Sequence, residues 1–187
     1  MNDLIVFAMQ EEVPTLINKY RNMFCIGVGK VNAALNTMML IDKHKPKRVI
    51  NLGTAGGIRV DSGVYRINKV VQHDVNLTAV GLAPGVHFHD LHSSIKIPGQ
   101  GKICASGDIF VTEPDKLRIE CDIIEMEAYS VAKACLLTGT SVEIWKYISD
   151  KADENAGVTW QDQVAAGEDL YMKVLYDLNV KLEENIK

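Results

Sequence analysis

The sequence predicts an α/β protein in which helices cover both faces of a mixed, mainly parallel central sheet, giving a single-domain, three-layer α/β/α arrangement. Short apolar runs rich in β-branched residues alternate along the chain with segments of helical period, as βαβ units require. Several of these runs are apolar at successive positions, which is typical of strands buried on both faces. Because no internal repeat or long linker is visible, residues 1–187 are expected to form one domain.

The apolar, β-rich runs predict the strands of this sheet. They lie at residues 4–9, 24–27, 49–52, 65–72, 103–106, 123–126 and 142–149. Glycine-rich residues 53–57 follow the third run. They are equally consistent with a tight turn between a strand and a helix and with a loop that approaches a ligand closely.

Segments of helical period predict the covering helices. They lie at residues 11–20, 30–44, 113–119, 128–138, 159–166 and 168–184. The last is the clearest, because Leu170, Val174 and Leu178 fall on one apolar stripe. Thr159 offers a capping hydroxyl for the helix before it. Residues 81–100 contain three Gly, two Pro and three His, and they are expected to form a loop.

Composition and charge exclude several classes of function. The net charge of −4 leaves no basic surface for nucleic acid. No apolar stretch approaches the roughly 20 residues that cross a bilayer. The start of the chain lacks the basic region of a signal peptide, and the four cysteines share no CxxC spacing. A cytoplasmic protein with reduced thiols, and without a nucleic-acid or membrane partner, is therefore expected.

Acidic side chains stand at the carboxyl ends of three predicted strands. Asp150 directly follows the last strand, and Glu125 and Glu127 lie at the end of the strand before it. Glu12 follows the first strand closely. In open α/β sheets this edge is where ligands bind, so the acids suggest acid/base chemistry on a polar small molecule.

Each of these residues also has a structural interpretation. Glu125 and Glu127 lie on one side of the extended chain, and a pair of sugar hydroxyls could satisfy one of them. An acidic side chain is equally favourable at the N-terminus of a helix, which is the structural alternative. Phe110 could form a wall against a planar base, although a core position is the more common role. Asp153 is more readily a turn cap, and Asp150 is therefore the better chemical candidate.

A histidine-rich stretch resembles a metal site in composition. His87, His89 and His92 surround Asp90, but nothing else in the chain suggests a metal. A solvated loop is the favoured interpretation, and no metal or cofactor is expected. No GxSxG motif is present, which disfavours nucleophilic acyl chemistry.

Taken together, six segments resemble one known family. The sequence is similar to the bacterial 5′-methylthioadenosine/S-adenosylhomocysteine nucleosidases, within the nucleoside phosphorylase fold family. The matching segments are AMQEEV at 8–13, GVGKV at 27–31, NLGTAGG at 51–57, SGDIFV at 106–111, IEMEA at 124–128 and ISDKAD at 148–153. They occur in the family's order and extend over nearly the whole chain.

The resemblance implies hydrolysis of the N-glycosidic bond of an adenine-type nucleoside by a cofactor-free homodimer. In this interpretation Glu12 activates the attacking water and Asp150 protonates nitrogen 7 of the purine. Ser149 would position Asp150. Glu127 would hold the ribose hydroxyls, and Met126 would pack under the sugar.

Other residues complete the substrate site that the resemblance implies. Phe110 would stack on the base, while the backbone of Val111 reads its edge. The remaining substrate-binding candidates are Met9, Thr54, Ala55, Gly56 and Glu125. The chain is shorter than family members between Tyr20 and Phe24 and between Gly81 and Lys102, which leaves the identity of the 5′ substituent open.

Three other functions remain as alternatives. A phosphorylase would use phosphate instead of water, but related phosphorylases carry an arginine where this chain has Asn51. A noncatalytic nucleoside-binding protein could keep the same fold. A metal-dependent hydrolase using His87 and His89 is the least favoured.

Overall fold

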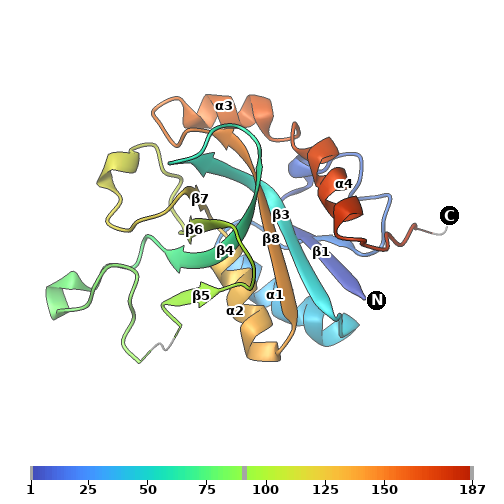
Figure 1. Cartoon of the computed structure of the whole chain (residues 1–187), viewed down its shortest axis with the longest axis horizontal. Coiled ribbons are helices and arrows are strands. Elements are labelled where there is room, and N and C mark those ends of the chain that lie inside the picture. The colour runs from blue at the N-terminus through green and yellow to red at the C-terminus, as the bar shows by residue number, and fades with distance from the viewer. Residues whose placement is uncertain (1, 90–91, 186–187) are drawn as a thin grey trace.

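The computed structural model describes residues 2–89 and 92–185, and its centre is one eight-stranded sheet (Figure 1). All seven predicted strands are present, with ends that differ by a few residues. The strands are β1 (Asp3–Phe7), β2 (Met23–Cys25), β3 (Arg48–Gly57), β4 (Val64–Gln72), β5 (Ser94–Lys96), β6 (Lys102–Ser106), β7 (Ile123–Glu125) and β8 (Ser141–Asp150).

The predicted mixed, mainly parallel sheet is confirmed. Five strand pairs are parallel, namely β1–β2, β1–β3, β3–β8, β4–β6 and β6–β7. Three are antiparallel, namely β3–β7, β4–β5 and β4–β8. As a result, the carboxyl ends of β1, β3 and β8 lie along one edge of the sheet.

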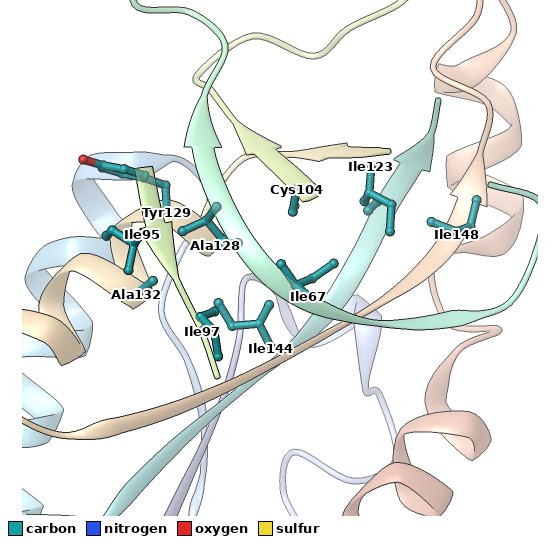
Figure 2. Close-up of a cluster of buried hydrophobic side chains, with 12 residues drawn as sticks. Ile67, Ile95, Ile97, Cys104, Ile123, Ala128, Tyr129, Ala132, Ile144 and Ile148 are labelled. Carbon is teal, nitrogen blue, oxygen red and sulfur yellow. The ribbon is translucent and has the colours of Figure 1, made fainter. Parts of the chain in front are cut away.

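The sheet is closed, whereas an open sheet was expected from the sequence. β8 pairs with both β3 and β4, so the pairs β3–β7, β7–β6, β6–β4, β4–β8 and β8–β3 form a closed ring. An apolar cluster packs against this ring, with Ile67, Ile123 and Ile144 at 0% exposure (Figure 2). Closure pairs strand edges and brings β7 beside the end of β3.

Helices cover both faces, which confirms the three layers. Two helices, α1 (Lys30–His44) and α2 (Ala128–Thr138), pack beside each other on one face, over buried side chains that include Leu4 and Val131. On the other face lies α4 (Glu168–Asp177), with Tyr171 and Leu175 in the core. The fourth helix, α3 (Ala156–Gln163), contacts β8 (Figure 1). The bounds of α1 and α2 coincide with those predicted.

Two predicted helices are wrong, and both contain a proline near their start. Residues 11–20 form only a 3-10 turn, Gln10–Glu12, followed by irregular turns. Residues 113–119 form only the 3-10 turn Pro114–Lys116. Proline disfavours the helical conformation at the residue before it, and Val13 accordingly has φ −144° and ψ 55°.

Other boundaries also differ from those expected. Helix α3 starts at Ala156, three residues earlier than predicted, so Thr159 lies inside it and donates to the carbonyl of Asn155. Helix α4 ends at Asp177 rather than at residue 184, because Asn179 adopts a left-handed conformation with φ 53°.

Two segments expected to be loops contain strand. β5 interrupts the loop predicted at residues 81–100, where it pairs with β4. Residues 53–57 form neither a turn nor a loop, because β3 runs through them to Gly57. Within the described part of the chain, no helix has the length and apolar character to cross a bilayer.

Candidate active site

The ends of β1, β3, β7 and β8 meet at a cavity of about 180 Å³. Eleven of the twelve residues expected at the site line it, and Ser149 lies directly behind. The eleven are Met9, Glu12, Thr54, Ala55, Gly56, Phe110, Val111, Glu125, Met126, Glu127 and Asp150. The other lining residues are Ala8, Val28, Ile109, Ile124, Ala152 and Trp160.

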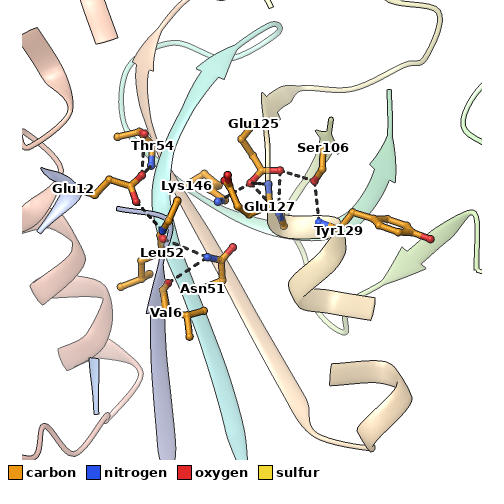
Figure 3. Close-up of polar contacts among 12 residues, drawn as sticks. Val6, Glu12, Asn51, Leu52, Thr54, Ser106, Glu125, Glu127, Tyr129 and Lys146 are labelled. Atoms are coloured by element: carbon orange, nitrogen blue, oxygen red, sulfur yellow. Dashed lines mark hydrogen bonds and ion pairs between the residues drawn. The ribbon is translucent and has the colours of Figure 1, made fainter. Parts of the chain in front are cut away.

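Glu12 is held by hydrogen bonds to both of its carboxylate oxygens (Figure 3). Its Oε2 accepts from the backbone N–H groups of Ala8 and Met9 at 3.0 and 3.2 Å. Its Oε1 accepts from the backbone N–H and the hydroxyl of Thr54 at 2.7 and 2.9 Å. Burial raises the pKa of Glu12 despite the opposing effects of Lys146 and these donors. A fixed carboxylate with a raised pKa is suited to accept a proton from water.

Gly53 makes room for this carboxylate. A Cβ at position 53 would lie 2.9 Å from Glu12 Oε1 and 3.4 Å from Lys146 Nζ. The glycine is therefore required by close packing inside a strand, not by the conformation of a turn.

Asp150 is turned toward the cavity by a bulge in β8. Ala55 pairs with Ile148 and Gly56 pairs with Asp150, so Ser149 is an extra residue opposite the β3 strand. The Ser149 hydroxyl donates to Asp150 Oδ2 at 2.8 Å, and the Ala152 N–H donates to Oδ1 at 2.8 Å. The carboxyl group is thus oriented from two sides.

Glu125 forms a buried ion pair with Lys146. Their Nζ–Oε2 distance is 2.8 Å, and both side chains are 2% exposed (Figure 3). Glu125 also accepts from the Ser106 hydroxyl and from the N–H groups of Glu127 and Ala128. Burial alone would raise the pKa of Glu125, but Lys146 and these donors outweigh it and lower the pKa. Protein groups therefore occupy much of its hydrogen-bonding capacity.

Glu127 lies both at the start of a helix and in the cavity. It is the N-cap residue of α2, and it also lines the cavity. Its Oε1 accepts from the Gly29 N–H at 2.8 Å. Burial, reinforced by the charge of Glu125, raises the pKa of Glu127 to about 8. Near neutral pH this carboxyl group holds a proton and can both donate to and accept from a sugar hydroxyl.

Aromatic side chains form one wall of the cavity. Phe110 is 46% exposed, so it is not a core residue. The rings of Phe110 and Trp160 meet edge-on with centroids 6.4 Å apart, and Trp160 Nε1 donates to the Thr54 hydroxyl at 3.2 Å. An open aromatic face of this kind can stack on a planar base.

Trp160 and Lys146 are among the residues at the site that were not anticipated from the sequence. Trp160 gives no distinguishing signal, because an aromatic residue early in a helix is ordinarily core. Lys146 did give a signal in the sequence. It lies two residues from both Ile144 and Ile148, so all three side chains point to the same, buried side of β8.

The remaining candidates lie elsewhere. Asp153 accepts from the N–H of Asn155, which confirms its role as a turn cap. His87, His89 and His92 do not line the cavity, and Asp90 lies outside the described residues. Among the residues with described positions, no three His, Cys, Asp or Glu side chains gather as a metal site.

Comparisons with known proteins agree with this geometry. The family model described as the Phosphorylase superfamily matches residues 12–98. A 5′-methylthioadenosine/S-adenosylhomocysteine nucleosidase of Geobacillus kaustophilus is 33% identical over 162 residues, covering 72% of this chain and 68% of the relative. One from Bacillus cereus (strain G9842) is 30% identical over 182 residues, covering 81% of this chain and 79% of the relative.

Solved structures show the same fold. A 5′-methylthioadenosine/S-adenosylhomocysteine nucleosidase from Neisseria meningitidis, in complex with methylthio-immucillin-A, has a TM-score of 0.79 and 25% identity over 92% of this chain and 96% of that chain. A futalosine hydrolase mutant of Helicobacter pylori has a TM-score of 0.83 and 22% identity over 95% of this chain and 99% of that chain. By sequence and fold together, the chain belongs to the 5′-methylthioadenosine/S-adenosylhomocysteine nucleosidase family.

Proposed function

We propose that this protein hydrolyses the N-glycosidic bond of an adenine-type nucleoside of the methylthioadenosine or S-adenosylhomocysteine class. The products are a free purine and a ribose derivative. The observation that supports this most directly is that Glu12 and Asp150, which are far apart in the sequence, line the same cavity beside Phe110 and Glu127.

Asp150 and Glu12 act on opposite sides of the bond that breaks. Asp150 donates its proton to nitrogen 7 of the purine while the bond between C1′ and nitrogen 9 breaks, and the bonding electron pair leaves with the base. Water attacks the oxocarbenium-like sugar at C1′ and gives its proton to Glu12. The negative charge of Glu12, which lines the cavity, stabilises the positive charge that develops on the sugar.

The other lining residues hold the substrate. Glu127 contacts the ribose hydroxyls, and Met126 packs beneath the sugar. Phe110 stacks on the base, with Trp160 at its edge. The backbone of Val111 reads the edge of the base.

Water is favoured over phosphate by the charges around the cavity. None of the described residues that line it is a lysine or an arginine, and four are acids. Asn51, which stands where phosphorylases carry arginine, is buried in the sheet, and its amide donates to the carbonyls of Val6 and Leu52 at 3.3 Å (Figure 3). A phosphate ion would lose its hydration without gaining the arginine that ordinarily binds it. A purely noncatalytic role is disfavoured because both acids are intact and oriented.

The protein is further proposed to act in the cytoplasm as a homodimer. On α1, Val31, Leu35 and Met39 recur every four residues and are 67%, 61% and 67% exposed. Such an apolar stripe is costly in water and is suited to an isologous interface with a second copy. Val28, two residues before α1, lines the cavity, so a second copy would lie near the site.

Replacing either acid should abolish most of the activity. Asp150→Asn removes the proton donor and Glu12→Gln removes the base, so each is expected to lower kcat for 5′-methylthioadenosine by about 10²–10⁴-fold while nucleoside binding persists. Release of adenine measures this. Asp153→Asn and Glu11→Gln are matched controls within a few residues, and they should retain activity to within about twofold. Catalysis at the wild-type rate by either acid variant would show that its role is misassigned.

The reaction should not need phosphate. We expect the wild-type protein to release adenine and the free ribose derivative at the same rate in phosphate-free buffer and in added phosphate. Chromatography of the sugar product tests this. A 1-phosphorylated ribose, or a rate that depends on phosphate, would establish phosphorolysis instead.

The α1 stripe should determine the oligomeric state. Light scattering after size-exclusion chromatography is expected to give twice the mass of the chain. Leu35→Glu should convert the protein to monomer, because a charge would then be buried in an apolar interface. Val158→Glu, at an equally exposed position on α3, is the control and should remain dimeric. A monomeric wild-type protein would rule out this assembly.

Glu127 should make the protein less stable as pH rises. Its pKa is raised from 4.5 to about 8, so the folded protein keeps a proton that the unfolded chain has released between these values. The unfolded state then binds fewer protons, and the free energy of unfolding falls with increasing pH. Glutamine does not ionise, so Glu127→Gln should gain stability relative to wild type between about pH 5 and pH 8, by roughly 1–3 kcal/mol.

Urea unfolding at about pH 5 and at about pH 8 measures the difference in the free energy of unfolding between Glu127→Gln and wild type. Glu154→Gln, which changes an exposed carboxylate, is the control, and its difference from wild type should not vary with pH. A pH-independent difference for Glu127→Gln would mean that Glu127 is ionised throughout this range.

A further inference from the structure

We propose that Lys30, Asp74 and Asp108 are positioning residues that fix the Phe110 wall of the cavity for substrate binding. We call these three residues the Lys30 clamp. The inference rests on the proposed function, which gives Phe110 and Glu127 their roles against the base and the ribose. The clamp adds residues that do not line the cavity and act through those that do.

The clamp is a closed set of three contacts between three segments of the chain. Lys30 Nζ forms an ion pair with Asp74 Oδ1 at 2.7 Å. The other oxygen, Asp74 Oδ2, accepts from the Asp108 N–H at 2.9 Å. The side chain of Asp108 then accepts from the Lys30 N–H through Oδ1 at 2.7 Å. Each residue therefore contacts both of the others.

The clamp joins the first turn of α1, the end of β4 and the segment after β6. Lys30 is the first residue of α1, and its Nζ also donates to Gln72, the last residue of β4, at 3.0 Å. Asp108 follows Ser106, the last residue of β6, by two positions. Neither α1 nor the residues after β6 can move without breaking contacts to the other.

Both clamped segments continue directly into the cavity. Asp108 is followed by Ile109, Phe110 and Val111, all of which line it. Lys30 is preceded by Gly29, whose N–H donates to Glu127 Oε1 at 2.8 Å. The clamp thus connects the residue proposed to stack on the base with the residue proposed to hold the ribose.

Besides the clamp, the segment that carries Phe110 (residues 107–113) is held by a hydrogen bond from the Gly107 N–H to the Glu125 carbonyl at 3.1 Å and by the ring contact between Phe110 and Trp160. Residues 107–113 form no helix or strand, and Ile109 and Phe110 are 60% and 46% exposed. The side chains of Lys30 and Asp74 are only 18% and 12% exposed, so their ion pair is partly shielded from solvent. Burial alone would raise the pKa of Asp74, but the hydrogen bond from Lys30 lowers it overall, so the carboxylate stays charged.

The catalytic acids are held independently of the clamp. Glu12 is fixed by Thr54 and by N–H groups that follow β1, and Asp150 is fixed by Ser149 and Ala152. Loosening the clamp should therefore weaken binding and leave the chemical step nearly intact.

The first test is the split between KM and kcat. Asp74→Asn is expected to raise KM for 5′-methylthioadenosine about tenfold and to change kcat by less than about threefold. Asp61→Asn, which changes an exposed aspartate away from the cavity, is the control and should leave both constants unchanged. An unchanged KM in Asp74→Asn would overturn the proposal.

The second test asks whether Asp74 acts through Phe110. Phe110→Ala alone should raise KM, and adding Asp74→Asn in that background should change it by less than about twofold. If the fold increases in KM of the two single variants multiply in the double variant, Asp74 does not act through the aromatic wall, and the proposal is overturned. If Asp74→Asn fails to fold, Lys30→Met breaks the same ion pair and is measured in the same way, with Lys30→Arg expected to restore much of the affinity.

Equilibrium binding separates this proposal from the proposed function. Adenine binding can be followed by the fluorescence of Trp160, which lines the cavity. A wild-type protein that neither binds adenine nor hydrolyses nucleosides would refute the proposed function. A wild-type protein that does both, with equal adenine affinity in Asp74→Asn, would refute the clamp alone.

Discussion

The site depends on one buried cation, Lys146. Its ammonium group is closed off from water, and it forms an ion pair with Glu125 and interacts with Glu12 and Glu127. Burial alone would lower the pKa of Lys146, but the surrounding carboxylates raise it, so the side chain stays charged. An unpaired charge at this depth would cost several kcal/mol, so the cation and Glu125 stabilise each other only as a pair. With Glu125 ionised, Glu127 is left holding a proton, and the two neighbouring acids acquire different tasks.

The sheet supplies this arrangement through the alternation of side chains. Lys146 points to the same side of β8 as Ile144, and in register it pairs with Gly53 of β3. The missing side chain of Gly53 is what allows Glu12 to approach the cation. One lysine and one glycine on adjacent strands therefore supply charge and space for an acid that comes from a separate turn after β1 and is held there by Thr54, Ala8 and Met9.

The sequence predicted what depends on local pattern. Apolar runs located every long strand, and the helical period gave α1 and α2 with their bounds. Both failed helices contain a proline: the turn Gln10–Glu12 ends just before Pro14, and the 3-10 turn Pro114–Lys116 begins at Pro114 but extends no further, although the apolar period continues. Residues 53–57 were expected to form a turn or a loop because their glycines are equally typical of a turn and of a strand packed closely against other groups. Here the groups in close contact are Glu12 and Asp150, and their positions are not evident from local sequence.

Non-local features could not be predicted in the same way. Closure of the sheet depends on β8 pairing with both β3 and β4, and no local period encodes a second partner. The candidate acids were identified because each stands near a strand end, where chemistry is expected. By contrast, Lys146 stands inside a strand, where only its spacing from Ile144 and Ile148 indicates that its side chain is buried.

The cavity combines a rigid part with a part held by polar contacts, and the difference has a physical origin. Glu12 and Asp150 are oriented by backbone N–H groups and by neighbours on long strands, which cannot shift without disturbing the sheet. The aromatic wall is carried by a segment without regular structure, so charged and hydrogen-bonded contacts, together with the ring contact between Phe110 and Trp160, restrain it. A proton transfer requires atomic positions fixed to a fraction of an ångström, whereas stacking on a base tolerates displacement. The long strands thus carry the acids, and the segment after β6, held by the Lys30 clamp, carries the aromatic wall.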